Sequence, residues 1–174
     1  MTIDAIRGDL TVEHADALVN AANSSLLGGG GVDGALHAAA GPALLAECRQ
    51  LRATRFPDGL PVGEAVATGA GRLPARWVIH TVGPNRSAGQ TDERQLGACY
   101  RNSLDVACGL GATSVAFPAI GAGVYGWDAA TAARVAVAAV LAHPRTGIGR
   151  VRFVLFSERL HSAFAAELRA VQRG

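Results

Sequence analysis

An aspartate and a histidine stand four residues apart behind a run of glycines, where their side chains could act together. Asp33 and His37 share one face of the helix that the sequence predicts over 33–40. Asn20 and Asn23 lie just upstream, at the end of a short apolar strand. A carboxylate, an imidazole and two amides can bind a sugar and orient a water molecule. Taken singly, Asp33 could instead cap the helix and His37 could be an ordinary half-buried histidine.

Two glycine-rich loops accompany these residues. The first covers 28–34 and leads into the predicted helix, and the second covers 121–126, between a strand and a helix. Both satisfy the pattern G-x-G-x-x-G, in which glycines let backbone N–H groups approach an anion beside a helix N-terminus. One such pattern is weak evidence, because a tight turn also explains it. Two of them in one small chain favour a diphosphate held from both sides.

Two common nucleotide-binding motifs do not fit these loops. A dinucleotide-binding βαβ unit needs its first glycine directly after a strand and an acid about 20 residues further on. Here about ten residues separate Val19 from the glycine run, and no strand near Thr54 ends in an acid. A P-loop requires a lysine, and the chain has none.

Apolar and helical stretches alternate along the chain, which predicts an α/β fold. We expect a three-layer α/β/α sandwich around a mixed, mostly parallel sheet, in a single domain over 1–174. The predicted strands are 17–19, 64–68, 77–82, 115–117 and 151–156. The predicted helices are 33–40, 42–51, 93–110, 129–142 after a cap at Asp128, and 161–172.

The composition excludes several classes of function. The net charge is +2, and the basic residues, all arginine, are scattered rather than gathered in the stripe typical of nucleic-acid binders. The three cysteines, Cys48, Cys99 and Cys108, show no metal-site spacing and are expected to be buried in a reducing compartment. No leader and no membrane-spanning run is apparent. We therefore expect a cytoplasmic monomer without a metal or cofactor.

The longest motif resembles a known family. The run from Asp16 to His37, DALVNAANSSLLGGGGVDGALH, closely resembles the signature of MacroD-type macrodomains. Further similarity lies in RGDLT at 7–11, LPARWVIHTVGP at 73–84 and FPAIGAGVYG at 117–126. The resemblance therefore extends through most of the chain and implies a macrodomain fold that binds ADP-ribose.

The resemblance implies ligand-binding positions on several loops. They are Asp9, Leu10, Gly30, Gly31, Val32, Ala119, Gly121, Ala122, Gly123, Val124, Tyr125 and Phe156. Asp9 would accept a hydrogen bond from the adenine amino group, and Phe156 would stack on adenine. The two glycine loops would hold the diphosphate, and Tyr125 would pack on the distal ribose.

The same resemblance implies a hydrolase. Asn20 and Asn23 would orient the distal ribose, while Asp33 and His37 would hold the catalytic water. Relatives remove ADP-ribose from acidic side chains and deacetylate O-acetyl-ADP-ribose. A glutamate ester leaves as a carboxylate with a pKa of about 4.3, so one acidic group can suffice, whereas arginine-linked ADP-ribose should react poorly. Either Asp33 or the substrate phosphate could be the base.

Other functions of this family remain as alternatives. A non-catalytic ADP-ribose reader shares the loops but often lacks the pair formed by Asp33 and His37. An enzyme that removes ADP-ribose from nucleic acid is also compatible, so the partners would be ADP-ribosylated proteins first and nucleic acids second. Poly-ADP-ribose glycohydrolases carry tandem glutamates, which are absent here. Many relatives have Ser-Thr where this chain has Gly121 and Ala122, so phosphate contacts from hydroxyls would be lost.

Overall fold

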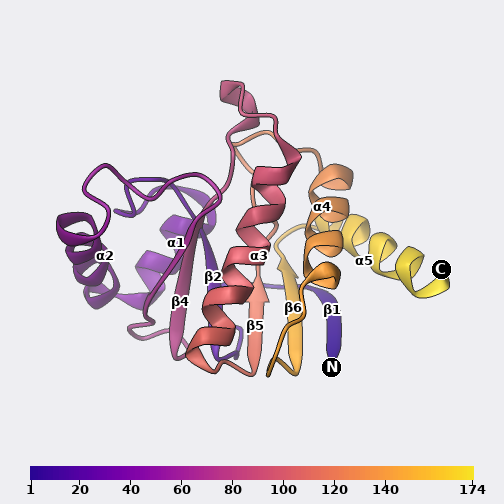
Figure 1. Cartoon of the computed structure of the whole chain (residues 1–174), viewed down its shortest axis with the longest axis horizontal. Coiled ribbons are helices and arrows are strands. Elements are labelled where there is room, and N and C mark those ends of the chain that lie inside the picture. Colours follow the sequence, from indigo (N-terminus) through magenta and orange to yellow (C-terminus); the bar gives the residue numbers. More distant parts are fainter.

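Six strands form one sheet in the computed structural model, which describes all 174 residues (Figure 1). The strand order is β1-β6-β5-β2-β4-β3, and every neighbouring pair is parallel except β3 with β4. The predicted mixed, mostly parallel sheet is thus confirmed. The strands are β1 (Thr2–Arg7), β2 (Ala17–Ala22), β3 (Ala65–Gly69), β4 (Trp77–Val82), β5 (Ser114–Phe117) and β6 (Arg150–Leu155).

Helices cover both faces of the sheet and complete the predicted three-layer α/β/α sandwich. Helices α1 and α2 pack on one face, and α3, α4 and α5 pack on the other (Figure 1). Their bounds are α1 (Gly31–Ala40), α2 (Pro42–Thr54), α3 (Glu93–Leu110), α4 (Ala129–Ala142) and α5 (Glu158–Arg173). Two short 3-10 turns, η1 (Leu10–Val12) and η2 (Arg86–Ala88), lie in loops. None of the helices is both long and apolar enough to cross a membrane.

The larger core lies between the sheet and the layer of α3, α4 and α5. Phe117 of β5 and Phe153 of β6 stand next to each other and pack on Tyr100 of α3 and Phe164 of α5. Their ring centroids are between 5.0 and 6.2 Å apart, and all four side chains are buried. This aromatic cluster fixes the middle of the sheet, from which the loops of the site extend.

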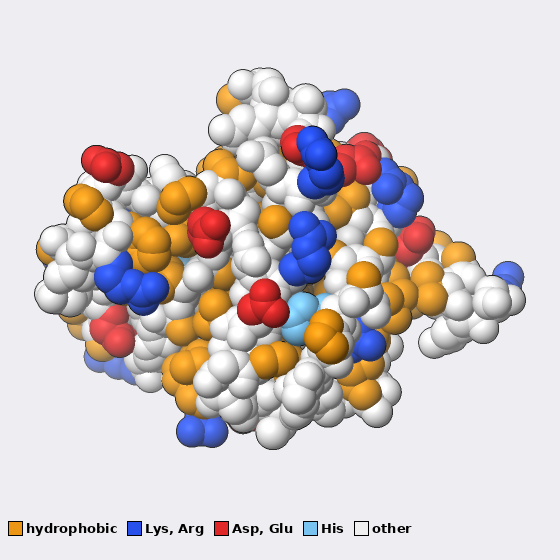
Figure 2. All heavy atoms as spheres, in the orientation of Figure 1, with side chains coloured by type: hydrophobic (Ala, Val, Ile, Leu, Met, Phe, Trp, Pro, Cys, Tyr) orange, Lys and Arg blue, Asp and Glu red, His pale blue; other side chains and the backbone are white.

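The outer surface of this layer carries charges of both signs. Figure 2 shows acidic and basic side chains close to one another on the face that α3 and α4 form. One such contact joins Arg134 of α4 to Glu93 of α3, at 2.8 Å. On this face the basic side chains are therefore interspersed with acidic ones.

The first strand, β1, is absent from the sequence-based prediction. It is an edge strand that pairs only with β6, and Asp4 stands opposite Arg152 and binds it at 2.8 Å. Buried strands are identified by an uninterrupted apolar run, and the charged Asp4, which is paired with a residue of the neighbouring strand, interrupts that run in β1. Among the cysteines, Cys48 and Cys99 are buried as predicted, whereas Cys108 is only partly buried.

Two helices begin earlier than predicted. Helix α5 starts at Glu158 because the hydroxyl of Ser157 accepts a hydrogen bond from the N–H of Leu160, which is a helix cap. Helix α1 starts at Gly31, so that Asp33 is the third residue of the helix rather than its cap. The predicted cap at Asp128 of helix α4 is present.

Candidate active site

A cavity of about 270 Å³ opens where the parallel strands end. The helix after β2 crosses one face of the sheet, and the helix after β5 crosses the other, so the chain diverges between these neighbouring strands. Such a point of divergence is the usual place for a ligand in an open α/β sheet. The lining residues are Ala21, Ala22, Asn23, Gly29, Gly30, Gly31, Val32, Asp33, Gly83, Ala119, Ile120, Gly121, Gly123, Val124, Tyr125 and Phe156.

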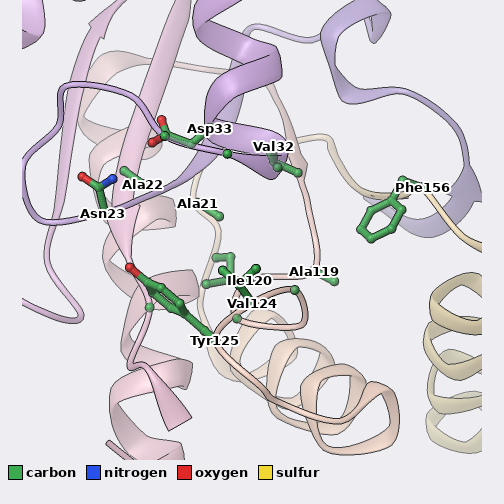
Figure 3. Close-up of a pocket in the computed structure, with 16 residues that line it drawn as sticks. Ala21, Ala22, Asn23, Val32, Asp33, Ala119, Ile120, Val124, Tyr125 and Phe156 are labelled. Atoms are coloured by element: carbon green, nitrogen blue, oxygen red, sulfur yellow. The ribbon is translucent and has the colours of Figure 1, made fainter. Parts of the chain in front are cut away.

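The residues that line the cavity differ in chemistry from one end to the other. Figure 3 shows Asn23, Asp33 and Tyr125 gathered toward one end, while Phe156 stands alone at the other. Phe156 is 65% exposed, as expected for an aromatic ring at a rim rather than in a core. The polar end suits a sugar with a reacting bond, and the aromatic end suits a flat ring.

The first glycine loop forms one wall and supplies free backbone donors. Gly30 precedes α1 in an extended conformation, and no side chain caps the helix. The first N–H groups of a helix have no acceptor within it, so those of the pocket-lining Gly31 and Val32 are available to an anion. The loop also packs tightly on α1, since a Cβ at Gly34 would collide with the carbonyl oxygen of Gly29.

The second glycine loop forms the opposite wall and is anchored on both sides. The hydroxyl of Tyr100 accepts a hydrogen bond from the N–H of Ile120 at 3.0 Å. Trp127 Nε1 donates to the carbonyl oxygen of Pro84 at 2.8 Å. The pocket-lining residues Gly123 and Val124 donate their N–H groups to no backbone acceptor. The two loops therefore present free donors toward each other across the cavity, as the paired motifs predict.

Gly121 occupies a backbone position at which a side chain would be strained. Its φ is +80°, in the left-handed region, and a Cβ there would lie 2.6 Å from Trp127 Cδ1. The N–H of Ala122 donates to the carbonyl oxygen of Ala119, and its side chain packs against the core. Ala122 is not among the residues that line the cavity, and its contact with a ligand stays a prediction.

Asp33 is the single acidic residue among those that line the cavity. It is only 4% exposed, and its Oδ1 accepts a hydrogen bond from Asn20 Nδ2 at 2.8 Å. Its Oδ2 is buried without a protein partner. Burial raises the pKa of this carboxyl, although the Asn20 hydrogen bond and the nearby His37 act in the opposite direction. The structure thus provides one carboxylate with a fixed and an unpaired oxygen.

Two of the four predicted catalytic residues lie behind this carboxylate rather than in the cavity. Asn20 is fully buried, donates its amide to Asp33 and is not among the residues that line the cavity, so its contact with a ribose stays a prediction. His37 places Nε2 3.4 Å from Asp33 Oδ1 and is not among the residues that line the cavity, so its predicted contact with a water stays a prediction. Both residues contact Asp33.

Asn23 lies where the sequence predicts it. It lines the cavity, and its Nδ2 donates to the carbonyl oxygen of Gly28 at 2.9 Å. Its Oδ1 accepts from both the N–H and the hydroxyl of Ser25. A Cβ on Gly29 would lie 3.1 Å from Asn23 Nδ2 and 3.3 Å from Asp33 Oδ2, so both side chains flank this glycine.

The two residues predicted to contact the ligand near the N-terminus, Asp9 and Leu10, lie outside the cavity. Asp9 is exposed, and its Oδ1 accepts hydrogen bonds from the N–H and hydroxyl of Thr11, which lower its pKa. Leu10, the first residue of η1, is buried. Neither residue lines the cavity, so the role of Asp9 in selecting adenine stays a prediction.

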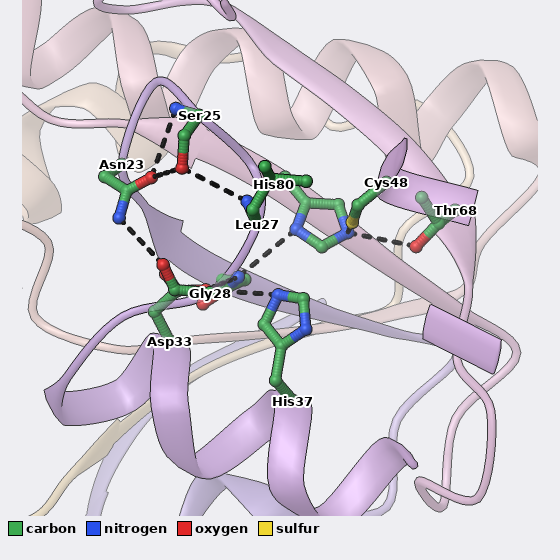
Figure 4. A network of polar contacts seen from close by, with 10 residues as sticks. Asn23, Ser25, Leu27, Gly28, Asp33, His37, Cys48, Thr68 and His80 are labelled. Atoms are coloured by element: carbon green, nitrogen blue, oxygen red, sulfur yellow. Dashed lines mark hydrogen bonds and ion pairs between the residues drawn. The ribbon is translucent and has the colours of Figure 1, made fainter. Parts of the chain in front are cut away.

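Sequence reasoning missed three residues beneath Asp33. His80 of β4 is fully buried, with Nδ1 3.2 Å from Asn20 Nδ2 and Nε2 3.0 Å from Thr68 Oγ1 (Figure 4). Cys48 Sγ lies 3.8 Å from the same Nε2. The available signal was a histidine in the middle of an apolar strand, at an inward-facing position.

Comparison with known proteins agrees with the fold. The family model described as Macro domain matches residues 19–136, more than half of the chain. A macro domain-containing protein of Streptomyces nogalater is 59% identical over 96% of this chain and 92% of its own length. A Cronobacter sakazakii protein named O-acetyl-ADP-ribose deacetylase is 50% identical over 90% of this chain and 87% of its own.

A solved structure extends this similarity to three dimensions. The Oceanobacillus iheyensis macrodomain with ADP superposes with a TM-score of 0.91 and is 41% identical. The match covers 97% of this chain and 90% of that one. Sequence, fold and family model agree, and this chain belongs to the macro domain family.

Proposed function

We propose that this protein binds ADP-ribose and hydrolyses ADP-ribosyl esters, including the acetyl ester of ADP-ribose. The observation that carries the proposal is Asp33, a buried carboxylate at the polar end of the cavity with one oxygen held by Asn20 and the other unpaired. The relative named O-acetyl-ADP-ribose deacetylase and the related macrodomain with ADP support the same reading.

The shape of the cavity suits each part of ADP-ribose. The free N–H groups of the two glycine loops bind the diphosphate in the middle, where hydrogen bonds to an anion are strongest. Phe156 stacks on adenine at the exposed end. Asn23 and Tyr125 contact the distal ribose at the opposite end, which places its anomeric carbon toward Asp33.

A single carboxylate is enough for this reaction. Asp33 orients a water molecule and accepts one of its protons, and the water oxygen bonds to the anomeric carbon of a glutamate-linked ADP-ribose. The bond between that carbon and the ester oxygen breaks, and the glutamate leaves as a carboxylate that needs no proton. On the acetyl ester, the water oxygen attacks the carbonyl carbon instead and gives a proton to Asp33. The bond between that carbon and the ribose oxygen then breaks, Asp33 returns the proton to the ribose oxygen, and acetate and ADP-ribose are released. Burial raises the pKa of Asp33 and so makes it a stronger base.

Asp33→Asn tests the chemistry separately from binding. We would measure ADP-ribose released from a protein carrying glutamate-linked mono-ADP-ribose, and ADP-ribose affinity by calorimetry, for the wild type, Asp33→Asn and the exposed-site control Asp58→Asn. Loss of a general base reduces rates by roughly 10²–10⁴-fold. We expect a loss of this size for Asp33→Asn, with affinity nearly retained, and wild-type behaviour for Asp58→Asn.

The other outcomes separate the alternatives. Binding by the wild type without release would contradict the ester hydrolase and leave a reader module. ADP-ribose attached to a nucleic-acid terminal phosphate would then be the next substrate. Failure of the wild type to bind ADP-ribose would overturn the whole proposal.

A further inference from the structure

Three polar side chains from three neighbouring strands lie in a row beneath α1. Asn20 of β2 pairs directly with His80 of β4, and Thr68 of β3 lies diagonally across from His80. All three are buried, and none lines the cavity. Their positions in the strands place all three side chains on the face of the sheet that α1 and α2 cover, and Figure 4 shows Thr68 and His80 facing each other there. An uninterrupted polar row in a buried sheet needs a reason, since each group loses its hydration.

The hydrogen bond that Thr68 donates determines which groups donate and which accept along this row. Thr68 Oγ1 donates its hydrogen to the carbonyl oxygen of Gly69 at 2.8 Å, so toward His80 it can only accept. His80 therefore carries its hydrogen on Nε2, and its Nδ1 is an acceptor. Asn20 Nδ2 supplies one hydrogen to that Nδ1 and the other to Asp33 Oδ1. Each donor in the row has one acceptor.

The surroundings of His80 keep it neutral. Burial is the main cause that lowers its pKa to about 3, and His37 of α1 adds to the effect. Cys48 of α2 also faces the ring, and burial raises the pKa of this thiol to about 11, so it carries no charge. Glu47 of α2 is exposed and accepts a hydrogen bond from the N–H of Gly69. The hydrogen bonds connect His80 to Asp33 only through Asn20.

We propose that His80 is a positioning residue whose ring, held by Thr68, sets the amide of Asn20 and thereby supplies Asp33 with its fixed hydrogen bond. This inference rests on the proposed function, in which Asp33 must direct its other oxygen at a water.

The amide of Asn20 needs such a partner because it has two possible orientations. Its Oδ1 is buried and receives no hydrogen bond from the protein, so only the two bonds of Nδ2 define which way the amide faces. If the hydrogen of His80 moved to Nδ1, the ring would donate toward Asn20 and favour the flipped amide. The flipped amide would place an oxygen against Asp33 Oδ1, and two acceptors would repel each other. The Thr68 hydroxyl prevents this.

Thr68→Val removes the hydroxyl while keeping the shape of the side chain. Without it, His80 Nε2 loses its acceptor, and the Cys48 thiol at 3.8 Å can donate to that nitrogen instead. Thr68→Ser retains the hydroxyl and should restore the wild-type state. Thr81→Val is the matched control, because Thr81 is another buried threonine whose hydroxyl donates to a backbone oxygen, that of Glu64, at 2.8 Å.

The first two readouts do not depend on activity. Long-range proton–nitrogen correlation spectra report which nitrogen of His80 carries hydrogen, and carbon-detected titration reports the pKa of Asp33. In Thr68→Val we expect hydrogen on Nδ1 and a raised pKa of Asp33, because a hydrogen bond to the charged carboxylate is lost. Thr68→Ser and Thr81→Val should match the wild type in both.

The third readout is the hydrolysis of the glutamate-linked ester. In Thr68→Val kcat should fall by roughly ten- to a hundredfold with little change in KM, because misplaced groups slow the chemical step. The acidic limb of its pH profile should move to higher pH. If Thr68→Val and Thr81→Val agree in the hydrogen position of His80 and in the pKa of Asp33, the inference is wrong. If they differ but the wild type does not hydrolyse the ester, the proposed function fails and the positioning role of His80 stands.

Discussion

Burial of a neutral histidine makes stability depend on pH in a way that can be calculated for His80. Its pKa is about 3 in the folded protein and near the ordinary 6.5 when the chain is unfolded. Between these values only the unfolded chain binds the proton, so stability falls as pH falls. The loss is about 1.4 kcal/mol for each pH unit below 6.5, and roughly 2 kcal/mol between pH 7 and pH 5.

Asp33 would complicate the measurement and is best removed. Its pKa is raised in the folded state, so its protonation stabilises the fold as pH falls, opposite in sign to the effect of His80. We would therefore compare Asp33→Asn with the double variant Asp33→Asn/His80→Gln by urea unfolding at several pH values from 5 to 7. Contributions from all other titrating groups are common to both proteins.

The difference in free energy of unfolding between these two proteins should change with pH. The slope below pH 6.5 should be about 1.4 kcal/mol per pH unit steeper in the protein that retains His80. The intercepts carry the cost of the substitution itself and do not enter the comparison. Parallel lines for the two proteins would refute the reasoning, since His80 would then accept a proton as easily when folded as when unfolded.

Two further substitutions test the loops of the cavity. Gly121→Ser should destabilise the fold by about 1–3 kcal/mol in urea unfolding, because its Cβ meets Trp127 at a left-handed backbone position. Gly123→Ser meets no atom within 4 Å and should unfold like the wild type, and equal losses for both would contradict this account. Phe156→Ala should weaken ADP-ribose binding by about tenfold in calorimetry through the loss of about 1–3 kcal/mol of stacking. Unchanged affinity would remove Phe156 from the adenine site.

The fold could be predicted from sequence where local signals and burial agree. The strand β4 was predicted with its observed bounds, because its apolar run is closed by Gly83 and Pro84. Helix α3 was also predicted with its observed bounds, since an apolar face and a terminal glycine mark it. The edge strand β1 was missed because its partner β6 lies about 150 residues away, and only that pairing satisfies Asp4.

The candidate site was predicted in part for a related reason. Glycine loops and Asp33 are visible in sequence because their function depends on neighbours along the chain. Asn20 was assigned to the ligand because a polar residue at a strand end usually faces a site, but the strand continues to Ala22 and turns its amide inward. That Thr68 and His80 lie beneath Asp33 could not be predicted, because their position depends on the order of the strands in the sheet, which no local sequence pattern encodes.

The polar row beneath α1 also bears on how the strands find their alignment. Apolar side chains alone distinguish adjacent registers weakly when a strand is covered on both faces, as β2 and β4 are. If β4 moved by one residue against β2, Ile79 or Thr81 would take the place of His80 opposite Asn20, and a buried amide would lose its acceptor. Misaligned sheets are therefore penalised at this one position, and the groups that hold Asp33 also help to select the native pairing of the strands during folding.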